Sequence, residues 1–240
     1  MQLTVALAAE EAAGVQALRL LTAHDHRVVA VLSDSREAAA GATVAGVAND
    51  AGIPLRPGSA VRDRALAGEL RAQGAHLLLN VHSLHIVDPE VLAAPTLGAY
   101  NLHPGPLPER AGLHAPSWAL YEGDETHAVT LHHMTAGVDE GPIVFAERFR
   151  VGPRATALEV MTDCVRRGLP LVERLLELAE NGEPVPAHPQ DLARRRWFGA
   201  GPPEGGRLDW NRPARRVADF LRACDYGPFP SPWGFPRCAA

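Results

Sequence analysis

The first 32 residues of the chain, MQLTVALAAEEAAGVQALRLLTAHDHRVVAVL, decide the fold class. Two short apolar runs, residues 3–8 and 27–32, flank a segment over residues 14–23 whose apolar side chains recur about three residues apart. This change of period predicts a strand, a helix and a second strand. A strand–helix–strand unit with short connections is typical of a parallel sheet, so we expect a sheet of that kind.

The same alternation continues beyond this first unit as far as residue 94. We predict helices over residues 43–51 and 60–72, and strands over residues 53–55 and 76–80. The predicted fold class is therefore α/β: a Rossmann-like, mostly parallel sheet with helices on both faces, plus a small C-terminal extension. Sheets of this type bind ligands at the carboxyl ends of their strands, which is where we look for a site.

The second half of the chain has a different character. Pro, Gly and His crowd into residues 95–112, after which we predict a short helix over residues 116–121 and strands over residues 128–134 and 143–150. A long amphipathic helix is predicted over residues 156–179. Pro170 lies inside that helix, where a missing backbone donor predicts a kink or a split into two helices.

The distribution of Pro and charge suggests three parts. We expect a main domain over residues 1–180, a polar linker rich in Pro and Arg over residues 181–204, and a small C-terminal extension over residues 205–240. The extension has its own strand and helix pattern and ends in a coil of Pro and aromatic residues. The candidate site described below falls within the main domain.

Composition excludes several functional classes. The chain has 240 residues with 23 basic and 28 acidic side chains, a net charge of -5, which argues against broad nucleic-acid binding. Every basic residue is Arg, so a Schiff-base lysine and a P-loop lysine are both excluded. The turn after the first strand, AAEEAAG (residues 8–14), lacks the Gly-rich fingerprint of dinucleotide-binding proteins.

Cysteine and histidine usage bears on compartment and metal binding. Three widely spaced cysteines argue against a disulfide framework, and with no signal peptide or apolar run long enough to span a membrane we expect a cytoplasmic protein. The pairs His82/His85 and His132/His133 admit a zinc interpretation. No Cys or carboxylate stands at matching spacing, so we predict no metal site.

One group of side chains is suited to acyl chemistry. Asn101 and His103 are two residues apart at the end of a predicted strand, so both project from the same face. An amide can donate to a developing oxyanion, and an imidazole can move a proton. Asp139, in a Gly-rich loop, is the best candidate to orient the imidazole. Such a pair by itself is more often turn chemistry than a catalytic site, so the pattern alone leaves both interpretations open.

Two longer segments carry a family resemblance. NLHPGPLPERAG (residues 101–112) and HAVTLHHMTAGVDEGPIV (residues 127–144) resemble the core of the folate-dependent formyltransferases. That family includes methionyl-tRNA, glycinamide ribonucleotide and sugar-nucleotide formyltransferases and the formylation domains of peptide synthetases. The resemblance covers residues 1–150, and RLDWNRPARRVADFLRA (residues 207–223) resembles the start of the C-terminal region in the tRNA and sugar enzymes.

The resemblance implies roles for particular residues. Asn101, His103 and Asp139 match the family's catalytic residues, and 10-formyltetrahydrofolate would be the co-substrate that donates a formyl group to a primary amine. On this basis Asn101 and a protonated His103 stabilise the oxyanion, while Asp139 raises the pKa of His103 and holds a water that relays the proton of the amine. The residues expected to hold the folate are Leu84, His85, Ile86, Val87, Thr135 and Ala136.

The motif also departs from the family's commonest form. GPLPERAG (residues 105–112) lacks a Ser and an Arg found in many relatives, and this form looks more like formyltransferases that work with peptide synthetases. We therefore expect the acceptor to be a primary amine on a small molecule or on an aminoacyl group tethered to a carrier protein, as in nonribosomal peptide biosynthesis. Sugar-nucleotide or glycinamide ribonucleotide formyltransferase and formyltetrahydrofolate hydrolase remain alternatives. A nucleic-acid or membrane partner is not expected, and a homodimer stays open.

Overall fold

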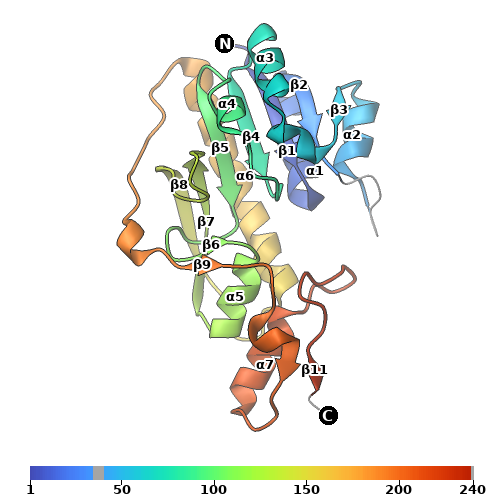
Figure 1. The fold of residues 1–240 in the computed structure, drawn as a ribbon, viewed down its shortest axis with the longest axis vertical. Coiled ribbons are helices and arrows are strands. Elements are labelled where there is room, and N and C mark those ends of the chain that lie inside the picture. Colours follow the sequence, from blue (N-terminus) through green and yellow to red (C-terminus); the bar gives the residue numbers. More distant parts are fainter. Residues whose placement is uncertain (35–40, 239–240) are drawn as a thin grey trace.

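A seven-stranded sheet forms the centre of the computed structural model, which describes residues 1–34 and 41–238. Its strand order is β3-β2-β1-β4-β5-β7-β8, parallel from β3 to β5 and antiparallel from β5 to β8 (Figure 1). The strands are β1 (Thr4–Ala9), β2 (Arg27–Leu32), β3 (Leu55–Arg56), β4 (Leu77–Val81), β5 (Gly98–His103), β7 (Thr126–His133) and β8 (Ile143–Arg150).

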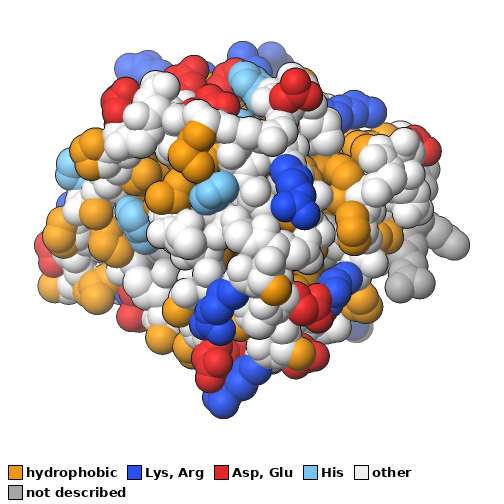
Figure 2. All heavy atoms as spheres, turned by 90° about the horizontal axis from the view of Figure 1, so that it is seen from above, with side chains coloured by type: hydrophobic (Ala, Val, Ile, Leu, Met, Phe, Trp, Pro, Cys, Tyr) orange, Lys and Arg blue, Asp and Glu red, His pale blue; other side chains and the backbone are white. Residues whose placement is uncertain are grey.

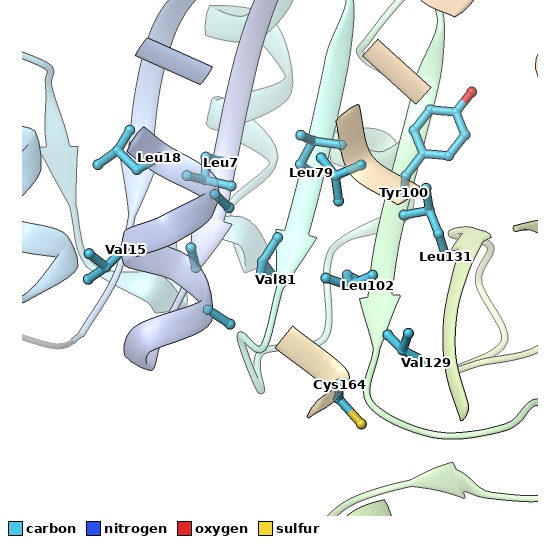
Figure 3. Close-up of a cluster of buried hydrophobic side chains, with 14 of the residues drawn as sticks. Leu7, Val15, Leu18, Leu79, Val81, Tyr100, Leu102, Val129, Leu131 and Cys164 are labelled. Carbon is cyan, nitrogen blue, oxygen red and sulfur yellow. The ribbon is translucent and has the colours of Figure 1, made fainter. Parts of the chain in front are cut away.

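Helices cover both faces of this sheet, because alternate strand residues point to opposite faces. Val5 and Leu7 of β1 belong to a core shared with α1 (Glu11–Ala23), α2 (Val44–Asp50) and α6 (Ala157–Asn181) (Figure 3). Ala6 and Ala8 of β1 belong to a second core with α3 (Arg64–Ala72) and α4 (Pro89–Leu92). The short helix η1 (Gly58–Arg62) precedes α3 along the chain. The predicted fold class is confirmed.

The long helix α6 does not divide at its proline. It runs without interruption from Ala157 to Asn181 with Pro170 inside it, so the predicted split into two helices is wrong, while the predicted kink stays a prediction. Thr156 and Glu159 form a capping box at its start, and buried residues on both sides of Pro170, among them Cys164 and Val172, pack on the core. Burying such side chains contributes more than one lost backbone hydrogen bond costs, so packing keeps both halves helical.

After α6 the chain runs along the β8 side of the sheet, and its last part, with α7, lies beside α5 (Ala115–Glu122) at one end of the sheet (Figure 1). The elements here are β6 (Ala111–Gly112), η2 (Leu192–Arg194), β9 (Trp197–Phe198), η3 (Pro203–Gly206), β10 (Arg207–Leu208), α7 (Ala214–Ala223) and β11 (Arg237–Cys238). β9 pairs with β6, β10 pairs with β11, and α7 packs on α5. The predicted linker thus contains a strand that joins the main domain, while the division into three parts stays a prediction.

The surface and the cysteines add two observations. On the face seen in Figure 2, side chains of Arg and of Asp and Glu are interspersed, and no continuous basic area covers that face. Cys164 and Cys224 are buried and Cys238 is exposed, and all three are free thiols. Within residues 1–34 and 41–238, no helix has the length and apolar character needed to cross a membrane.

Candidate active site

The candidate site starts at the carboxyl end of β5. Tyr100 and Leu102 of this strand point into the core, so the alternate residues Asn101 and His103 project from the opposite face. Their strand lies next to β4 in the parallel part of the sheet and next to β7 on its other side. Both side chains therefore lie at the carboxyl end of the strand, where α/β sheets bind ligands.

Asp139 reaches this pair from the loop between β7 and β8. The amide Nδ2 of Asn101 lies 3.4 Å from Asp139 Oδ1, and His103 Nδ1 lies 3.7 Å from Asp139 Oδ2. His103 and Asp139 are both buried. The structure thus brings together the three side chains that the sequence singled out from two distant segments.

The loop that carries Asp139 is held from several directions. Asp139 itself has a left-handed backbone (φ 56°), and its Oδ2 accepts a 2.8 Å hydrogen bond from the Gly112 N–H. Gln190 Nε2 donates to the carbonyl oxygens of Asp139 and Gly141, at 3.0 and 2.6 Å. A Cβ atom at Gly141 would lie 1.8 Å from the carbonyl oxygen of His133, so only glycine allows this close approach. Gln190 was not predicted, because its role depends on residues 181–204 lying against the site.

His132 is a further member of the cluster that sequence reasoning missed. Its Nδ1 lies 2.8 Å from the His133 carbonyl oxygen, to which it can donate, and its Nε2 lies 3.0 Å from Asn101 Nδ2 and 3.4 Å from Asp139 Oδ1. The antiparallel register of β5 and β7 places His132 directly opposite Asn101. The sequence contains the histidine but not this strand pairing, so it was considered only as a zinc ligand.

Burial and neighbouring charges set the protonation of the cluster. Burial alone would raise the pKa of Asp139, but His103, His132 and the Gly112 N–H together hold that pKa far below its usual range. Burial lowers the pKa of His103, although the carboxylate and the Arg110 carbonyl, 2.7 Å from Nε2, act in the opposite direction. The expected rise in the pKa of His103 is therefore wrong. At neutral pH the site holds a carboxylate beside a neutral imidazole whose Nε2–H is donated to Arg110.

A cavity of about 900 Å³ opens onto this cluster. Leu84 and Ile86 leave 66% and 65% of their surface exposed, which gives the wall flat apolar area. The volume falls in the range of pockets that hold organic ligands, about 300–1,000 Å³. Besides Asn101, His103 and Asp139, the lining includes all six residues expected to hold the folate: Leu84, His85, Ile86, Val87, Thr135 and Ala136.

These six residues come from two loops that line the same cavity. Residues 84–87 follow β4, and residues 135–136 follow β7, which runs antiparallel to β5. The imidazole of His85 is fixed by Asp34, whose Oδ2 lies 2.6 Å from its Nε2. Thr135 donates its hydroxyl to the Gly137 carbonyl, 3.1 Å away, and so shapes the loop that leads to Asp139.

The histidines considered as zinc ligands each contact a different group of the protein. His82 Nδ1 lies 3.6 Å from Glu11, whereas His85 pairs with Asp34 on another loop. His133 Nε2 lies 3.0 Å from the carbonyl oxygen of Pro186. Among the residues that the structure describes, no three His, Cys, Asp or Glu side chains are arranged to hold a metal ion.

Fold and site together define a class of protein. A mostly parallel α/β sheet presents an amide, an imidazole and a carboxylate in one cavity, at the carboxyl ends of its strands. An amide donor and an imidazole beside a carboxylate are the groups needed to stabilise an oxyanion and move a proton, the two requirements of acyl transfer.

Comparison with known proteins gives the family. The family model described as "Formyl transferase" matches residues 4–168. Methionyl-tRNA formyltransferase from Synechococcus sp. (strain JA-3-3Ab) is 33% identical over 173 residues, which are 72% of this chain and 53% of that relative. The chain belongs to the formyl transferase family, which confirms the predicted resemblance to folate-dependent formyltransferases. It spans about half the length of this relative.

Solved structures agree on the fold. Glycinamide ribonucleotide transformylase 1 from Symbiobacterium toebii is 26% identical, with a TM-score of 0.64 over 80% of this chain and 95% of its own. An N-formyltransferase from Helicobacter canadensis in complex with folinic acid and dTDP-3-aminofucose is 14% identical, with a TM-score of 0.73 over 93% of this chain and 80% of its own. The second likeness is one of fold alone.

Proposed function

We propose that this protein is an enzyme that transfers the formyl group of 10-formyltetrahydrofolate to a primary amine. The observation that carries the proposal is the meeting of Asn101, His103 and Asp139 at the wall of one cavity, with contacts of 3.4 and 3.7 Å. Membership of the formyl transferase family supports the same chemistry.

The cavity lining supports a folate co-substrate. The aromatic pterin ring needs an apolar surface, and the exposed side chains of Leu84 and Ile86 in the cavity lining supply one. The co-substrate supplies a formyl carbon bonded to its N10, and we place that carbon beside Asn101 and His103. The folinic acid in the Helicobacter canadensis relative supports a folate ligand for this fold.

The protonation states of His103 and Asp139 indicate the role of each side chain in the reaction. Asn101 donates an N–H to the oxygen on which negative charge develops, and its long 3.4 Å contact with Asp139 can be exchanged for this bond. Neutral His103 accepts a proton from the attacking amine at Nδ1, and the anionic Asp139 stabilises the resulting imidazolium. A bond forms between the amine nitrogen and the formyl carbon while the bond from that carbon to N10 breaks, and His103 returns the proton to N10. The products are the formylated amine and tetrahydrofolate.

For the acceptor, we propose a small molecule or an aminoacyl group tethered to a carrier protein. The form of residues 105–112 supports this choice over a tRNA or a sugar nucleotide, and the net charge of -5 argues against a nucleic-acid partner. Three free thiols, two of them buried, suit a reducing compartment, and we place the enzyme in the cytoplasm. The division into a catalytic domain (1–180), a linker (181–204) and a C-terminal extension (205–240) belongs to this proposal.

The His103→Ala variant tests the function. We expect it to abolish formyl transfer while folate affinity stays within about tenfold, since the imidazole acts on the reacting atoms rather than on the pterin. Transfer is followed by mass spectrometry as the gain of one carbonyl unit on members of an amine panel. Substantial residual transfer by the variant would remove His103 from the mechanism. Release of tetrahydrofolate by the wild type without any amine would favour the hydrolase alternative.

A further inference from the structure

A second polar cluster lies in the same cavity, outside the three proposed catalytic side chains. It consists of Glu11 at the start of α1, His82 after β4, His114 before α5 and Tyr226 in the C-terminal extension. His82 Nδ1 lies 3.6 Å from Glu11 Oε2, and the Tyr226 hydroxyl lies 3.0 Å from the Ser117 hydroxyl. Four segments distant in sequence thus contribute one side chain each to this corner.

The backbone at this corner is strained. Glu11, His82 and His114 all have left-handed backbones, with φ values of 59°, 62° and 57°. Residues with a side chain rarely adopt this conformation, and such residues persist mainly where a binding or catalytic site requires a particular direction of the side chain. Here the strained positions direct three polar groups to the cavity wall.

Two groups in the cluster have unused bonding capacity. The His82 side chain is only 5% exposed, yet its Nε2 has no hydrogen-bond partner within the described chain. A buried nitrogen without a partner is costly, and ligand contact is one way to satisfy it. The Glu11 side chain is 67% exposed while lining the cavity, so its carboxylate is accessible to a ligand there.

The charge of this corner is negative. Contact with His82 lowers the pKa of Glu11, which keeps it ionised, and burial lowers the pKa of His114, which keeps it neutral at pH 7. Among the described residues, the cavity lining contains no Arg, although the chain has 23 basic residues and all are Arg. Within residues 1–34 and 41–238, a phosphate group on the acceptor would meet carboxylates and no fixed cation in the cavity lining.

The cluster shares one cavity with the proposed reacting centre. Glu11 and His82 line the same cavity as His103. An acceptor in this cavity can therefore contact Glu11 with one group while another group reaches the formyl carbon.

We propose that Glu11, with His82 beside it, binds a second, protonated nitrogen of the acceptor. The acceptor is then a small basic amine with at least two nitrogen centres and no phosphate: one nitrogen is formylated and the other is held by Glu11. This inference rests on the proposed formyl transfer and narrows its substrate class.

Binding measurements test the subsite without requiring turnover. Calorimetric titrations of the full chain compare 1,4-diaminobutane, butylamine and O-phosphoethanolamine as probes on the wild type and on Glu11→Gln. We expect Glu11→Gln to weaken binding of 1,4-diaminobutane about tenfold or more, as loss of a charge-assisted hydrogen bond implies. Butylamine should lose affinity by a smaller factor, because its single ammonium group cannot occupy the Glu11 subsite and the acceptor position together. Glu177→Gln removes an exposed charge on α6, away from the cavity, and should have no effect.

Glu11→Asp keeps the charge on a shorter arm and is expected to retain part of the selectivity. Equal affinity of the wild type and Glu11→Gln for 1,4-diaminobutane would overturn the inference, as would tighter binding of O-phosphoethanolamine than of the diamine. Transfer assays with the same amines separate the two proposals. Selective binding without formylation of any amine counts against the proposed function alone, whereas equal kcat/KM values for diamine and monoamine count against the subsite alone.

Discussion

Replacing Asp139 by Asn removes the negative charge beside His103 with little change in side-chain volume. Asn can still present an oxygen to the Gly112 N–H, which donates to Oδ2 at 2.8 Å in the wild type. The loop should therefore keep its position, since Gln190 holds it through backbone carbonyls rather than through the carboxylate. The substitution isolates the electrostatic role of the carboxylate.

The size of the effect follows from the distance between the two side chains. His103 Nδ1 and Asp139 Oδ2 are 3.7 Å apart. At an effective dielectric constant of about 20, unit charges at this distance attract each other by about 4.5 kcal/mol. That attraction is lost when His103 becomes an imidazolium in the variant, and about 1.4 kcal/mol corresponds to a tenfold change in rate. We expect kcat to fall by about three orders of magnitude.

Single-turnover transfer from 10-formyltetrahydrofolate to an amine measures this loss, with folate affinity followed by tryptophan fluorescence. Folate affinity should change little, because the proposed pterin contacts lie at residues 84–87 and 135–136. Asp163→Asn is the matched control, as Asp163 pairs with Arg166 on α6, outside the cavity, and should keep full activity. A folded Asp139→Asn variant with more than a tenth of wild-type kcat would refute the electrostatic role.

Two further outcomes test the geometry and protonation of the site. The imidazole of His103 should titrate by NMR below the ordinary pKa of about 6.5, because burial disfavours its charged form. Asp139→Asn should lower this pKa further, since it removes the anion that opposes the effect of burial. A pKa above about 6.5 for His103 would contradict the assignment. Gly141→Ala places a Cβ atom 1.8 Å from the His133 carbonyl oxygen, so the loop must move and the rate of formyl transfer should fall about 100-fold. Gly152→Ala is the control and should be neutral, because its Cβ atom would lie 3.7 Å from the nearest atom. Equal rates for the two variants would show that the loop position is unimportant.

Local sequence patterns were sufficient for most of the elements. Residues 27–32 and 143–150 form β2 and β8 with the predicted bounds. The predicted helix over residues 60–72 is instead two elements, η1 and α3, because Asp63 accepts a hydrogen bond from the Ala65 N–H and starts a new helix. A capping side chain inside an apolar periodicity was the signal for this boundary.

The site was predictable where its residues carry their own chemistry. Asn101 and His103 project to the same face because a strand has a period of two, and that requires no knowledge of the rest of the fold. His132 and Gln190 could not be found in this way. Their contacts depend on the register of β7 against β5 and on the course of the chain after α6, which short-range patterns do not specify.

The amino-acid sequence alone determined the order of strands and helices, the chemical groups at the end of β5 and the exclusion of lysine-dependent and Gly-rich nucleotide sites. The tertiary structure decided which distant segments meet: β4 next to β1, residues 181–204 against the Asp139 loop, and Glu11 in the same cavity as His103. It also decided the direction of the pKa shift of His103. Proximity to a carboxylate favours the imidazolium, but burial disfavours it more strongly, and burial is a property of the folded chain.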